Sequence, residues 1–115
     1  MVGSRPEGDW TVVVARGEFD IETRELLHRE LSGGLRDAAR GVVLDLAGVT
    51  FWDCSSLNVL LAARRAASRE GKTVTIRVAG PSAHRILELT GALPLLAAPD
   101  YRIHRPAARL AAAAG

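Results

Sequence analysis

The stretch VVLDLAGVTFWDCSSL, residues 42–57, decides the fold of this chain. The apolar run at 42–46 predicts a buried strand, and a second apolar patch follows at 49–52. Residues 53–57 then open a long helical segment. Hydroxyl side chains therefore stand at a strand-to-helix turn, where backbone N–H groups and the helix dipole favour an added negative charge. The turn is suited to a phosphate, and no catalytic base accompanies it.

Strands and helices alternate along the rest of the sequence. The expected order is a strand at 10–15, a helix capped by Asp20 or Thr23 and carrying Leu26, Leu27, Leu31 and Leu35, the strand at 42–46, a helix at about 56–69 stopped by Gly71, a strand at 73–78, a short helix from Pro81 to Gly91 and an edge strand at 101–103. We expect Gly33 and Gly34 to break or bend the first helix. Helices that follow strands imply crossovers and a mainly parallel sheet.

Composition indicates one small domain. The 115 residues, 48% of them hydrophobic, provide a single core, and we expect one α/β domain over 1–115 with an Ala-rich helical tail at 107–114. No apolar run approaches the roughly 18 residues of a membrane span, and the N-terminus lacks an apolar signal segment. A single cysteine fits a reducing compartment, so we expect a cytoplasmic protein without membrane contact.

Charge and motif patterns exclude several function classes. The net charge of +2 comes from basic residues spread through 51–115, without a dense basic run or stacking aromatics, so we expect no direct nucleic-acid partner. The three histidines are far apart in the sequence, and no metal-ligand spacing or Gly-rich phosphate loop is present. We therefore expect no metal, no cofactor and no enzymatic activity.

Three motifs together resemble a known family. They are a hydrophobic-Asp-hydrophobic strand followed by Asp-x-Ser-x-Leu at 53–57, Gly-Glu-Phe-Asp at 17–20, and Ile-Leu-Glu-Leu-Thr-Gly at 86–91. Their order and spacing resemble the STAS domain, above all the bacterial anti-sigma factor antagonists. The resemblance implies a STAS-type α/β domain, with a mixed, mostly parallel sheet, packed helices and an antiparallel strand formed by residues before Trp10.

The resemblance also implies a function. An unphosphorylated antagonist binds an anti-sigma factor, usually a serine kinase that uses ATP, and frees the sigma factor for transcription. In that family the serine two residues after the aspartate is phosphorylated, which here is Ser55, and phosphorylation breaks the complex until a phosphatase restores it. No cofactor and no particular oligomeric state are implied.

The residues of the turn have alternative interpretations. Ser55 could serve only as a helix N-cap. Ser56 stands where the family usually has glycine, and it either hinders phosphorylation or offers a second acceptor. Cys54 is either an inert, buried thiol or a reactive thiol at a helix N-terminus. Asp53 is expected to hold the turn, while Asp20 either contacts the partner or simply caps a helix.

The helix after the turn has an apolar side at Val59, Ala62, Ala63 and Ala66. Leu57 and Leu61 fall outside it, so they are either covered by a neighbouring helix or form a docking spot beside Ser55. The candidate partner-binding residues are Asp20, Asp53, Ser56, Leu57 and Leu61.

Two other functions remain open at this point. The chain could be a STAS interaction module in a stress-signalling or lipid-transport assembly, with Ser55 purely structural. It could also be a redox sensor or thiol enzyme built on Cys54.

Overall fold

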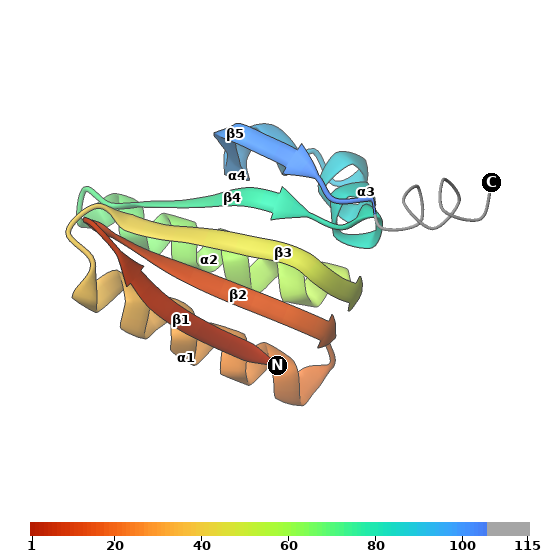
Figure 1. The fold of residues 1–115 in the computed structure, drawn as a ribbon, viewed down its shortest axis with the longest axis horizontal. Helices are drawn as coiled ribbons and strands as arrows, with labels where there is room; N and C mark the ends of the chain where they lie inside the picture. Colours follow the sequence, from red (N-terminus) through yellow and green to blue (C-terminus); the bar gives the residue numbers. More distant parts are fainter. Residues whose placement is uncertain (106–115) are drawn as a thin grey trace.

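The sheet follows the order of the chain. The computed structural model describes residues 1–105, which form five strands in the order β1-β2-β3-β4-β5 and four helices (Figure 1). The elements are β1 (Val2–Glu7), β2 (Trp10–Glu18), α1 (Ile21–Asp37), β3 (Gly41–Phe51), α2 (Cys54–Arg69), β4 (Thr73–Ala79), α3 (Pro81–Leu89), α4 (Leu93–Leu96) and β5 (Ala97–Ile103). The Ala-rich tail expected at 107–114 lies outside the described residues.

Strand directions confirm the predicted fold class. β1 pairs antiparallel with β2, and the other three pairs are parallel, so the sheet is mixed and mostly parallel. The strand ahead of Trp10 is the antiparallel one, as expected. The single-turn helix α4 was not predicted, because a four-residue helix has too few positions to show a period.

All four helices contribute to one core. Parallel crossovers are almost always right-handed, so a sheet that grows in one direction carries its connecting helices on one face. In Figure 1, α1 and α2 lie together behind the strands. Leu31 of α1, Leu60 of α2, Leu87 of α3 and Leu96 of α4 belong to the same cluster of buried apolar side chains, which includes Leu44 of β3.

The two glycines of α1 do not interrupt it. The helix runs from Ile21 to Asp37, so the predicted break at Gly33 and Gly34 is wrong. A Cβ at Gly34 would lie 3.1 Å from methyl groups of both Thr11 and Val42, because the helix axis approaches the sheet closely there. Gly34 also accepts a hydrogen bond from the Thr11 hydroxyl at 3.3 Å. The glycine therefore permits close helix–sheet packing.

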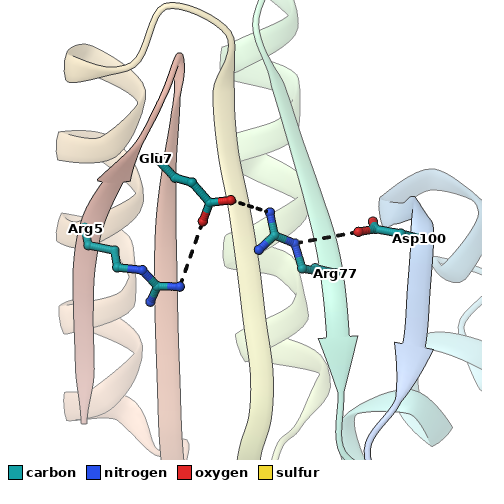
Figure 2. A network of polar contacts seen from close by, with 4 residues as sticks. All are labelled: Arg5, Glu7, Arg77 and Asp100. Atoms are coloured by element: carbon teal, nitrogen blue, oxygen red, sulfur yellow. Dashed lines mark hydrogen bonds and ion pairs between the residues drawn. The ribbon is translucent and has the colours of Figure 1, made fainter.

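A chain of ion pairs links the strands at both edges of the sheet. Glu7 of β1 lies 3.9 Å from Arg5 and 3.3 Å from Arg77 of β4, and Arg77 lies 3.9 Å from Asp100 of β5 (Figure 2). Arg77 is half-buried and its partners are solvent-exposed, so each pair contributes at most about 1 kcal/mol. Together the pairs connect β1, β4 and β5, which are distant in the sequence.

Candidate functional site

The helices α1 and α2 begin side by side at the carboxyl edge of the parallel strands. The Phe19 N–H, ahead of α1, donates a hydrogen bond of 3.1 Å to the carbonyl of Phe51 at the end of β3. The rings of Phe19 and Trp52 lie 5.4 Å apart between centroids. These two contacts bring the caps Asp20 and Asp53 to the same edge of the domain.

Asp53 holds the first turn of α2. One carboxylate oxygen, Oδ1, accepts hydrogen bonds from the Ser56 N–H at 2.9 Å and from the Ser55 hydroxyl at 2.8 Å. These bonds favour the ionised form, so the Ser56 N–H and then the Ser55 hydroxyl hold the pKa of Asp53 below its ordinary value. Asp53, not Ser55, is therefore the N-cap, and its predicted role in holding the turn is confirmed.

Ser55 lies half-buried in the first turn of α2 and does not supply the cap. Its hydroxyl donates to Asp53 and keeps its oxygen lone pairs for another contact. The cap survives without the hydroxyl, because the Ser56 N–H also binds Asp53. Chemistry at this oxygen can thus change the local charge while the helix start stays in place.

Asp20 caps α1 in a similar way. Its Oδ1 accepts from the Thr23 N–H at 3.0 Å and from the Thr23 hydroxyl at 2.8 Å. These bonds, led by the Thr23 N–H, lower the pKa of the Asp20 carboxyl. The predicted capping role is confirmed, and the exposed carboxylate is also free to meet a partner.

Burial corrects two of the candidate partner residues. Ser56 is 1% exposed and Leu57 2% exposed, so neither reaches a docking protein, and Ser56 is not an accessible second acceptor. Leu61 is half-buried and packs against the core. The predicted apolar face of α2 is only half right, since Val59 and Ala63 pack against the core whereas Ala62 and Ala66 are exposed. The larger side chains of Leu57 and Leu60 bury more apolar area, and they set the orientation of the helix.

Cys54 is exposed, which contradicts the prediction of a buried thiol. It is the first residue of α2, directly after the cap Asp53. Its small size and hydrophobic character gave no indication of this position, which follows from the placement of the cap one residue earlier.

Two exposed apolar side chains at the same edge were missed by the sequence analysis. Ile21, directly after the cap of α1, is 70% exposed, and Phe51, at the end of β3, is 56% exposed. The exposure of Ile21 could have been predicted, because the first helical position after a capping aspartate precedes the buried side of the helix. The exposure of Phe51 could not, because the sequence pattern predicts where the strand ends but not the direction of its last side chain.

Residues 1–105 contain no group of three or more His, Cys, Asp or Glu side chains placed to hold a metal ion. None of the helices in this part of the chain is long and apolar enough to span a bilayer.

Comparison with known proteins agrees with the fold. The family model of the Mlab, STAS domain matches residues 3–96. The chain belongs to the STAS domain family. This STAS domain is 23% identical over 94 residues to the anti-sigma F factor antagonist of Paenibacillus polymyxa, which covers 81% of this chain and 80% of that protein.

Two solved structures share the STAS fold seen here. The anti-sigma factor antagonist SpoIIAA in its unphosphorylated form superposes with a TM-score of 0.70 at 16% identity, covering 90% of this chain and 87% of that one. An anti-sigma factor antagonist from Mycobacterium paratuberculosis gives a TM-score of 0.71 at 25% identity, with 84% and 81% covered. These matches confirm the α/β fold expected from the sequence.

Proposed function

We propose that this STAS domain is an anti-sigma factor antagonist controlled by phosphorylation of Ser55. The unphosphorylated domain binds an anti-sigma factor that is also a serine kinase, and so releases a sigma factor in the cytoplasm. The domain itself performs no catalysis, and a phosphatase resets it. The observation that carries the proposal is the Ser55 hydroxyl, 2.8 Å from Asp53, in a helix start that is capped without it.

Electrostatics explains how one phosphate could break the complex. A phosphoserine carries about −1.5 to −2 charges at neutral pH. Here it would stand beside the ionised Asp53, which now accepts a hydrogen bond from the same oxygen. The added charge and volume would change the surface at the edge of the sheet, while the Ser56 N–H keeps the cap. The partner would leave a domain that remains folded.

The partner surface is proposed around this turn. Asp20 and Asp53 supply negative charge, and the exposed Ile21 and Phe51 supply apolar area that a partner would cover. This surface takes the place of the docking spot predicted at Leu57, which is buried.

Phosphorylation is tested with ATP and an anti-sigma factor serine kinase from the same organism. Intact-protein mass spectrometry should show one added phosphate, which Ser55→Ala abolishes. Ser56→Ala and Thr23→Ala should keep it, since Ser56 is buried and Thr23 belongs to the other cap. No phosphate on the wild type, with a kinase active on another substrate, would contradict the switch and favour a STAS interaction module in which Ser55 is structural.

Docking is tested by isothermal titration calorimetry, in which the unphosphorylated domain binds the same kinase. Ile21→Asp or Phe51→Asp should weaken binding at least about tenfold, equivalent to about 1.4 kcal/mol. Leu89→Asp is the matched control, because Leu89 is 71% exposed at the far end of α3. Equal losses in all three variants would show that the partner does not bind at this edge.

A further inference from the structure

A second cluster of polar side chains lies between α3 and β5, apart from the Ser55 turn. The Tyr101 hydroxyl of β5 and His84 Nδ1 of α3 lie 2.7 Å apart, and the two rings stack with their centroids 5.8 Å apart. His84 Nε2 lies 3.0 Å from a carboxylate oxygen of Glu88, one turn further along α3. These contacts fasten the edge strand β5 to the helix.

The chemistry of these three side chains assigns their protons. An ionised carboxylate can only accept a hydrogen bond, so His84 Nε2 carries a hydrogen and donates it to Glu88. In the neutral ring, Nδ1 then accepts from the Tyr101 hydroxyl. Because the imidazole engages Glu88, this carboxylate opposes a nearby anion less than an unpaired one would.

A cavity of about 470 Å³ opens beside this cluster. One part of its wall comes from α3, with His84, Arg85 and Glu88, and another comes from Ile103 and Arg105 at the end of β5. Alternate side chains of a strand point to the same side, so the contact of Tyr101 with α3 also directs Ile103 toward that helix. The cavity therefore depends on the docking of β5 against α3.

The cavity lies at the carboxyl ends of the parallel strands. Its helix α3 begins directly after β4, and Arg105 follows the end of β5. The Ser82 hydroxyl in the first turn of α3 donates a hydrogen bond of 3.3 Å to the Thr50 carbonyl of β3. Open α/β sheets bind their ligands outside the carboxyl ends of their strands. The position is thus a usual one for a small-molecule site.

Positive charge predominates in the wall of the cavity. Arg85 and Arg105 supply two guanidinium groups, whereas Glu88 supplies one carboxylate. Within residues 1–105, none of the close ion pairs uses either arginine, and Glu88 is paired with His84. Each guanidinium therefore keeps its forked N–H donors for an anion.

We propose that this cavity binds a small organic dianion, which is either a phosphate monoester or a short dicarboxylate. An arginine fork binds carboxylate or phosphate oxygens with two parallel N–H bonds, so two forks match two negative charges. Pro81 and Ile103 give the carbon part of the ligand an apolar wall. The volume falls in the range of about 300–1,000 Å³ that is typical of ligand sites. The proposal does not depend on Ser55, which does not line the cavity.

The test is a ligand titration of the full chain, followed by ¹H–¹⁵N NMR at fixed pH and ionic strength. Glycerol 3-phosphate and succinate are the dianionic probes, and glycerol and acetate are their neutral and monoanionic controls. At least one dianion should shift the amide signals of Arg85 and Arg105 until they saturate, and should bind about tenfold more tightly than its control. The dianion that saturates them identifies the anionic group.

Variants locate the binding. Arg85→Gln and Arg105→Gln should each weaken the binding of that dianion about fivefold or more, because each removes a charged hydrogen-bond donor. Both arginines are exposed, so a dispersed spectrum should show that the fold persists. Arg69→Gln makes the same change of charge in the last turn of α2, outside the cavity, and should leave the affinity unchanged. Arg85→Lys, which keeps the charge but not the fork, should lie between the wild type and Arg85→Gln.

The outcomes decide the proposal without reference to the kinase. Failure of both dianions to saturate the signals would overturn it. Equal losses in all three Arg→Gln variants would also overturn it, because they would reflect the net charge of the domain. Losses confined to Arg85→Gln and Arg105→Gln support the cavity as the site, whether or not Ser55 is phosphorylated.

Discussion

The starts of α1 and α2 use the same cap but bond different hydroxyls. In α1, Asp20 takes both the N–H and the hydroxyl of Thr23. In α2, Asp53 takes the N–H of Ser56 and the hydroxyl of Ser55. In α1, a single residue therefore donates both hydrogen bonds to the capping aspartate. In α2, the hydroxyl bond comes instead from Ser55, the residue before the one whose N–H is capped.

The difference arises from how deeply each first turn is packed. The fourth residue of α1 is the half-buried Arg24, whereas the fourth residue of α2 is Leu57, which is 2% exposed. Core packing fixes α2, so its hydroxyl at Ser55 is available for regulation. α1 lacks that anchor, and its threonine reinforces the cap. A modifiable side chain is thus best placed where the core already holds the backbone.

The largest change in stability should come from substitution of the fourth residue of α2. Leu57→Ala should lower the free energy of unfolding by about 3 kcal/mol, because it removes buried methyl groups and leaves a cavity. Arg24→Ala should cost less than about 1 kcal/mol. Urea denaturation of both variants gives the values. Similar losses in the two would break the comparison, since α2 would then not be held more firmly than α1.

Substitution of the third helical residue by alanine should change the stability in opposite directions in the two helices. Ser56 Oγ is buried without a hydrogen-bond partner among the described residues, so Ser56→Ala should stabilise the domain by about 1 kcal/mol. Thr23→Ala should cost about 0.5 kcal/mol, because it loses the bond to Asp20 but keeps the N–H cap. Thermal unfolding measures both. A loss of stability in Ser56→Ala would mean that its hydroxyl has a partner such as a buried water.

The smallest expected effect is the loss of stability at low pH through the two capping carboxylates. Both caps have a carboxyl pKa below the ordinary 3.8, so their contribution is complete above that pH and is lost as the pH falls through the lower folded values. Urea midpoints from about pH 6 to about pH 2 should decline less steeply in Asp20→Asn and in Asp53→Asn. Ser55→Ala should partly reproduce the Asp53→Asn profile. An unchanged acid profile in Asp53→Asn would show that the cap is not charge-dependent.

Apart from β1, which only the resemblance implied, and the short α4, which was not predicted, the sequence predicted the order of elements because its signals are local. Alternating apolar residues, the aspartates before the helices and Gly71 after α2 act within a few positions of themselves, and those predictions hold. The direction of individual side chains depends on packing between distant segments. The face of α2 differs in part from the predicted one, because a large side chain such as Leu57 buries more apolar area than an alanine such as Ala62. The exposure of Phe51 has the same tertiary origin.

The candidate site was partly predictable for the same reason. Asp53 and Ser55 stand two residues apart, so their contact could be expected from the turn alone. Asp20 lies at the same edge as this turn only because α1 and α2 start side by side, which no spacing in the sequence encodes. Gly34 shows the same limit, since its role depends on Thr11 and Val42.

A sheet whose spatial order equals its order in the chain also has a consequence for synthesis. Each strand from β2 onward pairs with the strand made just before it. A chain that emerges N-terminus first, at about 5–20 residues per second, can add every new strand to an edge that already exists. No early strand has to wait for a distant partner, which shortens the time that an unpaired edge is exposed to aggregation in the crowded cell.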